Sequence, residues 1–293
     1  MFKCLSPAPL GINAPLNDLI EPALSHGFKS LELDVVSFAE QVHRAGMPAA
    51  RRLIDSASLK MGFFRLPFAL SGDDQEFGAG LGALAGQAKL AAELGCTRCV
   101  ALLDPSDDER PLHQNFVVYQ QRLGALSKLL GEQGIQLGVG FTATPEQRAG
   151  RAFEFIRNFD VLKLLLGMLG DKNVGVVVDL YELWASGSAY QAVIEAGLKP
   201  VVLFVADAAN DADPDEALQT GRLLPNETGV IDTVGALQAF AANGYDGPVV
   251  PLPHPVRFQG MPRAAVCKLT GDQLEEAWKA AGIKPAKRPA LMR

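Results

Sequence analysis

The feature that most constrains the fold of this chain is a repeated alternation of short β-rich segments with longer amphipathic segments. Segments that alternate in this way are typical of parallel βα units. Two helical segments show apolar stripes at helical spacing, one from Phe116 to Leu130 and one from Phe155 to Leu169. The predicted strands, eight in number, are Lys3–Ser6, Ser30–Val35, Met61–Leu66, Arg98–Leu103, Gln136–Thr142, Val174–Leu180, Val201–Asp207 and Pro248–Leu252.

Glycines mark the predicted joints between a helix and the following strand. Gly27, Gly95, Gly134 and Gly244 each stand where a left-handed C-cap would release the chain into the next strand. A doubly wound open sheet is the alternative, but no Gly-x-Gly-x-x-Gly follows the first strand. The sequence therefore predicts a single (β/α)8 TIM barrel, with one domain spanning residues 1–293 and a basic tail at 283–293. Only the segment from Ala208 to about Gly229 is long and lacks a predicted element.

Composition and charge exclude several classes of protein. A net charge of −6 and a pI of about 5.3 disfavour a nucleic-acid partner, because such partners attract basic surfaces. The sequence has neither the apolar core of a signal peptide nor an apolar run long enough to span a bilayer. We therefore expect a cytoplasmic protein without a membrane partner.

The cysteines form no disulfide framework in a chain of this length. Cys96 and Cys99 have the spacing of a redox motif, but they open a predicted strand rather than a helix. We interpret them as structural thiols, with redox or metal use as the lesser alternative.

Polar residues gather at the predicted carboxyl ends of the strands, where active sites of such barrels lie. They include Glu32, Asp34, Arg65, Asp104, His113, Thr142, Thr144, Asp179, Tyr181, Glu182, Asp207, Arg222, His254 and Arg257. Half of these or more are expected in any barrel as helix caps and rim ion pairs.

Four segments resemble one family of enzymes. The segments at 173–179 (NVGVVVD), 134–138 (GIQLG) and 244–249 (GYDGPV) resemble strands six, five and eight of the xylose isomerase-like sugar (phosphate) isomerases and epimerases. The segment LLPNETGVID at 223–232 resembles the "LPGEGVID" loop of that family. This resemblance implies a TIM barrel that acts on open-chain sugars with one divalent cation, which polarises the carbonyl.

The resemblance also places the metal ligands of the family on this sequence. They fall on Gly140, Asp179, Phe204 and Leu252, so only one position retains a ligand. The histidine of the Asp-x-x-His motif becomes Glu182, and an arginine of the strand-seven loop is kept as Arg222. One carboxylate cannot hold Mg²⁺ or Mn²⁺, so we expect no metal cofactor unless the site is rebuilt.

A rebuilt site could in principle use Asp179, Glu182, Asp207 and His254. Strand alternation disfavours it, because Asp207 has the opposite parity to Phe204. Without a cation, the pKa of Asp179 should rise unless Arg222 or Arg65 reaches it. If the site is dismantled, Asp179→Asn is expected to leave stability level or to raise it.

The resemblance favours a divergent family member that binds a sugar, polyol or sugar phosphate at the barrel mouth with the metal chemistry lost. Two alternatives stay open, namely an active isomerase or epimerase with a rebuilt or metal-free site, and a non-catalytic partner of an active paralogue. A homodimer also stays open. The candidate catalytic residues are Asp179, Glu182 and His254, and the candidate binding residues are Arg65, Tyr181, Trp184, Arg222 and Arg257.

Overall fold

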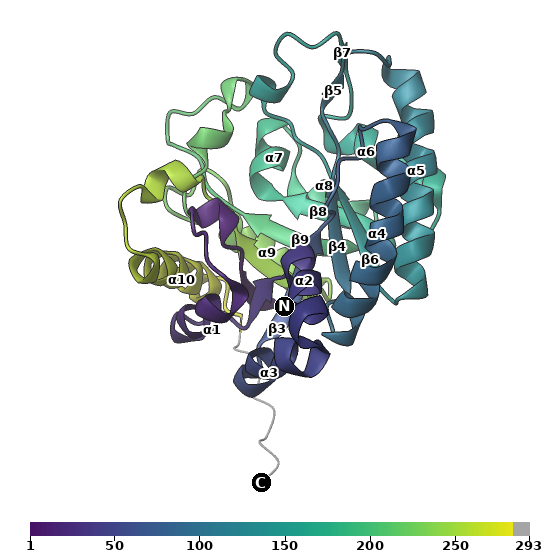
Figure 1. Ribbon diagram of the computed structural model, residues 1–293. Helices are drawn as coiled ribbons and strands as arrows, with labels where there is room; N and C mark the ends of the chain where they lie inside the picture. The colour runs from purple at the N-terminus through teal and green to yellow at the C-terminus, as the bar shows by residue number, and fades with distance from the viewer. Residues whose placement is uncertain (284–293) are drawn as a thin grey trace.

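Parallel strands close into a barrel in the computed structural model, which describes residues 1–283 (Figure 1). In order around the barrel, the eight strands are β1 (Phe2–Leu5), β10 (Pro248–Pro251), β9 (Pro200–Val205), β8 (Val174–Asp179), β6 (Gln136–Gly140), β4 (Arg98–Leu102), β3 (Lys60–Arg65) and β2 (Ser30–Glu32). A separate antiparallel pair joins β5 (Ser106–Asp107) to β7 (Phe153–Glu154). The predicted TIM barrel is thus confirmed, whereas the predicted basic tail lies outside the described residues apart from Ile283.

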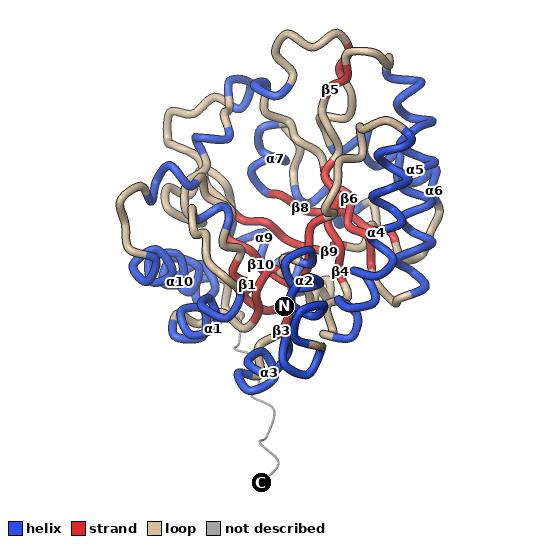
Figure 2. Tube along the Cα trace, viewed as in Figure 1, coloured by secondary structure: helices blue, strands red, loops and turns tan. Residues whose placement is uncertain are grey.

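Helices surround the barrel, as the blue segments around the red strands of Figure 2 show. They are α1 (Leu16–Ser25), α2 (Val35–Ala45), α3 (Met47–Ala57), α4 (Asp74–Glu93), α5 (Leu112–Glu132), α6 (Phe159–Leu169), α7 (Leu180–Ala185), α8 (Tyr190–Glu195), α9 (Thr233–Ala242) and α10 (Arg263–Ala280). In the described part of the chain, no helix is long and apolar enough to cross a membrane.

The structure confirms one of the two predicted apolar stripes and shifts the start of the other. In α5 the predicted stripe is buried from Tyr119 to Leu130, which confirms the helix. The second predicted stripe begins too early, because α6 starts at Phe159 and Phe155 precedes it. Asn158 caps α6 by accepting a hydrogen bond from the backbone N–H of Val161, and this cap sets the start of the helix.

The predicted strands all extend beyond the observed carboxyl ends. The largest excess is at β2, where Val35 was predicted as strand but is the first residue of α2. Asp34 caps this helix by accepting from the backbone N–H of Ser37. The predicted glycine joints are confirmed, since Gly27, Gly95, Gly134 and Gly244 all have a left-handed φ between 68° and 82°.

The long segment after β9 is folded rather than structureless. It contains two short 3₁₀ helices, η3 (Pro214–Glu216) and η4 (Gln219–Gly221), and Asp207 and Leu223 form an isolated β-bridge. The buried Asp207 carboxylate accepts hydrogen bonds from the backbone N–H groups of Ala208, Thr228, Gly229 and Ile231. This aspartate therefore anchors the returning part of the loop.

Apolar side chains fill the interior of the barrel. Phe63 of β3 and Phe204 of β9 meet edge to face, with ring centroids 5.7 Å apart. These strands lie four places apart in a ring of eight, on opposite sides of the barrel, so the contact crosses the barrel axis. The two phenylalanines belong to a buried apolar cluster inside the barrel.

Gly175 of β8 provides a test of how closely β8 and β9 pack. A Cβ at this position would overlap the carbonyl oxygen of Lys199, so Gly175→Ala should lower the free energy of unfolding by about 2 kcal/mol. Gly82, inside α4, has open space around its Cβ direction, and Gly82→Ala should raise stability by about 0.5 kcal/mol. Urea unfolding of both variants checks the pair, and equal effects would contradict this packing.

Candidate functional site

An arginine buried between two carboxylates dominates one side of the barrel mouth. Arg222 is 4% exposed, and its Nη1 and Nη2 donate to Asp179 Oδ1 and Oδ2 at 3.1 and 3.0 Å. Its Nη2 also donates to Glu182 Oε1 at 2.6 Å. Asp179 is the last residue of β8 and caps α7, so the strand-to-helix turn holds both carboxylates toward the arginine.

The other polar atoms of this cluster are also paired. Gln219 donates from Nε2 to Glu182 Oε1 at 2.6 Å and to Thr144 Oγ1 at 2.9 Å, and its Oε1 accepts from Arg222 Nε at 2.7 Å. The backbone N–H of Ala143 donates to Glu182 Oε2 at 2.6 Å. The network thereby ties together the loops that follow β6, β8 and β9.

Burial and neighbouring charges act in opposite directions on this cluster. Burial raises the pKa of Glu182, and the Arg222 guanidinium opposes that rise. Burial alone would lower the pKa of Arg222, but Asp179 and Glu182 raise it above its usual range. Arg222 is therefore a fixed positive charge. Of the two arginines that the sequence offered as partners of Asp179, Arg222 is the one that reaches it.

Tyr181 and Trp184, predicted as binding residues, lie beside this network. The Arg222 guanidinium stands 4.5 Å from the centroid of the Tyr181 ring. Tyr181 is 1% exposed, its hydroxyl donates to the carbonyl oxygen of Leu218 at 2.7 Å, and burial raises its pKa to about 12. Trp184 is half-buried, with its ring centroid 5.3 Å from that of Tyr181, and presents part of its surface to solvent.

The four family metal positions do not fit a divalent cation. A Cβ at Gly140 would lie 2.7 Å from the Leu102 side chain and 3.0 Å from Val177, so a glutamate there would require these side chains to shift. Phe204, beside Asp179 in the sheet register, is 1% exposed and apolar. Leu252 packs against the same interior cluster. Asp179 would remain as the one oxygen ligand, and both of its oxygens already accept from Arg222.

The alternative ligand set is not brought together either. Asp207 is occupied by its backbone donors, and His254 Nδ1 accepts from the backbone N–H of Val256 at 3.3 Å at the start of η5 (Pro255–Phe258). Within residues 1–283 no group of three or more His, Cys, Asp or Glu side chains is placed to hold a metal ion. Arg257, also predicted to bind ligand, donates to both carboxylate oxygens of Glu227 at 2.6 and 2.8 Å.

A second arginine, Arg65, lies on the opposite side of the mouth. It ends β3, and its Nε donates to Glu32 Oε1 at 2.9 Å. The Ser6 hydroxyl donates to the other Glu32 oxygen. Sequence analysis identified Glu32 and Arg65 only as separate strand-end residues. Their opposite charges at the ends of strands that pair in the barrel were the signal for an ion pair.

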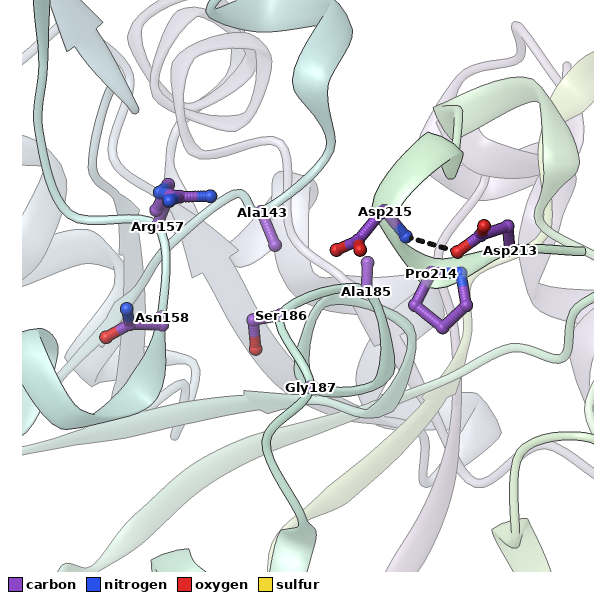
Figure 3. A pocket seen from close by; sticks show the side chains of 9 residues that line it. All are labelled: Ala143, Arg157, Asn158, Ala185, Ser186, Gly187, Asp213, Pro214 and Asp215. Carbon is purple, nitrogen blue, oxygen red and sulfur yellow. Dashed lines mark hydrogen bonds between the residues drawn. The ribbon is translucent and has the colours of Figure 1, made fainter.

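Arg65 and Glu32 line a cavity of about 710 Å³ between the loops that follow β1, β2 and β3. Its volume is within the usual range for small-molecule sites. A smaller cavity of about 240 Å³ lies beside the end of α7 and is shown in Figure 3. Three of its polar residues have structural roles: Arg157 pairs with Glu154, Asn158 caps α6 and Asp213 caps η3. The larger cavity is the better candidate for a ligand.

Cys96 and Cys99 are free and fully buried. Burial raises the pKa of the Cys96 thiol to about 12 and that of Cys99 well above its usual range. Because the thiolate is the reactive form, these environments support the structural interpretation rather than redox use.

The ion pair changes the expected effect of replacing Asp179. Asp179→Asn removes the negative charge facing a buried guanidinium, so it should lower the free energy of unfolding by about 3 kcal/mol. The sequence alone predicted no loss. Asp55→Asn, which breaks the exposed pair with Arg51, is the matched control and should cost less than about 1 kcal/mol. Chemical denaturation measures both, and an Asp179→Asn protein as stable as its parent would contradict a structural role for the pair.

Comparison with known proteins agrees with this architecture. The family described as xylose isomerase-like TIM barrel matches residues 20–260. No curated protein matches the chain. A xylose isomerase domain protein from Alicyclobacillus acidocaldarius subsp. acidocaldarius is 25% identical, with a TM-score of 0.85 over 96% of this chain and 99% of that one.

Two further solved structures share the fold at lower identity. The IolI protein, solved with a bound zinc atom, is 16% identical, with a TM-score of 0.76 over 96% of this chain and 98% of that one. D-psicose 3-epimerase from Clostridium cellulolyticum H10, solved with D-tagatose, is 13% identical, with a TM-score of 0.74 over 96% of this chain and 99% of that one. Since the family match covers most of the chain and the barrel is closed in the same way, the chain belongs to the xylose isomerase-like TIM barrel family.

Proposed function

We propose that this protein binds a sugar, polyol or sugar phosphate at the carboxyl end of the barrel and does not perform the divalent-metal isomerisation of its family. The observation that carries the proposal is the bidentate pairing of Arg222 with Asp179, the one remaining family ligand. A cation at Asp179 would have to displace the buried Arg222 guanidinium, which would then lose one of its two carboxylate partners.

Support for a sugar-like ligand comes from the relatives and from the residues of the mouth. Solved structures with the same fold include D-psicose 3-epimerases bound to D-tagatose and in the presence of D-fructose. Here Arg65 and Trp184 remain partly exposed and could supply hydrogen bonds and a stacking surface. Leu102, 44% exposed at the end of β4, adds an apolar contact.

A metal-free isomerase would need a base that reaches the substrate. Asp179 and Glu182 both face Arg222, and Glu182 is 4% exposed, so neither is placed as a free base. His254 is half-buried, and its Nδ1 accepts from the backbone. The Nε2 of His254 is not part of this bond, so, within the described residues, His254 is the one of the three candidate catalytic residues that keeps a free basic atom. The geometry therefore favours binding over isomerisation.

The cytoplasmic location, the homodimer and the absence of a nucleic-acid partner stay predictions of the sequence. So does the alternative role as a non-catalytic partner of an active paralogue. The acidic net charge supports the exclusion of nucleic acid. Size-exclusion chromatography with light scattering would measure the oligomeric state directly.

A thermal-unfolding titration of chelator-treated protein tests the proposal. A ligand at about one hundred times its Kd adds about 2.7 kcal/mol, which is a shift of several degrees for a domain of this size. We expect no shift with Mn²⁺, Co²⁺ or Mg²⁺, and an upward shift with at least one member of a panel of sugars, polyols and sugar phosphates.

Two variants test whether a shift of the unfolding temperature with metal comes from binding at Asp179. A saturable metal shift that is lost in Asp179→Asn but kept in Asp213→Asn, in the exposed acidic loop, would overturn the loss of metal chemistry. A panel without any shift would overturn sugar binding.

A further inference from the structure

The Arg65 guanidinium lies over the axis of the barrel. It stands 5.2 Å from the ring centroid of Phe204 and 5.8 Å from that of Phe63. Because these two rings come from opposite sides of the barrel, a group above both lies near its centre. Arg65 keeps 34% of its side chain exposed, whereas only 5% of the Arg222 side chain is exposed. Of these two arginines, Arg65 is the one that a ligand can reach.

Glu32 fixes the orientation of Arg65. Its Oε1 accepts from Arg65 Nε, and its Oε2 accepts from the Ser6 hydroxyl. Glu32 is itself largely buried, with 13% of its side chain exposed. Within residues 1–283, the bond from Nε is the only hydrogen bond that the Arg65 side chain makes, so the donors on Nη1 and Nη2 stay available. A planar guanidinium held at Nε is preorganised to bind an anion with its terminal nitrogens.

The cavity beside Arg65 offers room and an apolar wall. Its lining includes Ile12 and Leu66 from the loops after β1 and β3, and Leu16 and Val36 from the first turns of α1 and α2. These loops belong to the purple and blue N-terminal part of the chain in Figure 1. With about 710 Å³, the cavity can hold the carbon skeleton of a small metabolite as well as its charged group.

The charged residues of the cavity favour an anion. Both acids are already engaged, because Glu32 pairs with Arg65 and Asp34 accepts from the backbone N–H and the hydroxyl of Ser37. The side chain of Arg44, an exposed residue of α2 that lines the cavity, makes no hydrogen bond or ion pair with the described residues. The lining therefore has arginine donors without acceptors, and its carboxylates already have donors.

We propose that this cavity, off the axis and on the β1–β3 side of the mouth, binds a small organic anion. Its carboxylate or phosphate group binds the terminal nitrogens of Arg65, and its carbon skeleton packs against the apolar wall around Leu16. The inference rests on the proposed function in placing the ligand at the mouth, and it narrows the ligand from any sugar to an anionic one.

Isothermal titration calorimetry with four probes tests this site. D-gluconate and glucose 6-phosphate carry the anion on a sugar skeleton, hexanoate carries it without a sugar, and D-glucose is neutral. We expect at least one of the three anions to bind more tightly than D-glucose by about tenfold or more. Comparison of gluconate with glucose 6-phosphate decides between carboxylate and phosphate.

Variants connect the binding to Arg65. Arg65→Gln should weaken anion binding by about tenfold or more, and Arg65→Lys should restore part of it by keeping the charge. Arg51→Gln, which removes an exposed arginine on α3, is the matched control and should leave binding unchanged. Far-UV circular dichroism confirms that each variant is folded, and the partial recovery in Arg65→Lys separates loss of charge from a general loss of structure.

The outcomes separate this inference from the proposed function. Binding of D-glucose as tightly as the anions, unaffected by Arg65→Gln, would keep the proposed function and overturn the anion site. Binding of hexanoate through Arg65 with no sugar ligand would keep the anion site and overturn the sugar assignment. If no anion binds at about 10 mM, or if anions bind equally well to Arg65→Gln, the inference is wrong.

Discussion

The buried ion pairs of Arg222 with Asp179 and Glu182 are the interaction on which the rest of the site depends. A guanidinium removed from water is tolerated only when anions and hydrogen-bond acceptors surround it, and here the partners come from the turn after β8 and from Gln219. Because Gln219 and Glu182 also bind Thr144 and Ala143, a single charge organises three loops. On the side of β6, β8 and β9, these loops are consequently held together by a paired polar network.

The opposite side of the mouth has a different character. Arg65 also pairs with a glutamate, but only through Nε, and it covers Phe63 and Phe204 instead of being enclosed by polar groups. The ring of Phe204 stands at a position onto which the resemblance places a metal ligand of the family, and it packs there against Phe63. The cavity then lies off the axis, toward β1, β2 and β3. One residue type thus has two roles, structural at Arg222 and open to ligand at Arg65.

Sequence patterns predicted the barrel and its joints because these depend on local chemistry. A helix-ending glycine such as Gly134 and a cap such as Asp232, which accepts from the backbone of Gly235, act within a few residues. Arg222 was predicted as a binding residue and as one of two candidate partners for Asp179, and the structure shows the pairing. The Ser6–Glu32–Arg65 chain and the cavity were missed, since they depend on side-chain directions from three separate strands, which no local pattern records. The predicted strands extend past the observed ends in part because the next residue is often apolar and still bonds to the neighbouring strand, as the backbone N–H groups of Leu66, Leu103 and Leu252 do.

Under the proposed function, Asp179 is paired with a guanidinium and not with a metal ion, and the donor geometry gives this pairing a chemical consequence. A catalytic cation keeps coordination positions for the substrate, whereas the Nε, Nη1 and Nη2 of Arg222 are engaged by Gln219, Asp179 and Glu182. Arg222 can therefore neutralise the carboxylates but cannot polarise a carbonyl at the mouth. For a cation to bind Asp179, the buried Arg222 would have to lose this carboxylate partner, at a cost of about 3–5 kcal/mol. A divalent ion would also lack the oxygen ligands to offset that cost, because Phe204 and Leu252 provide none.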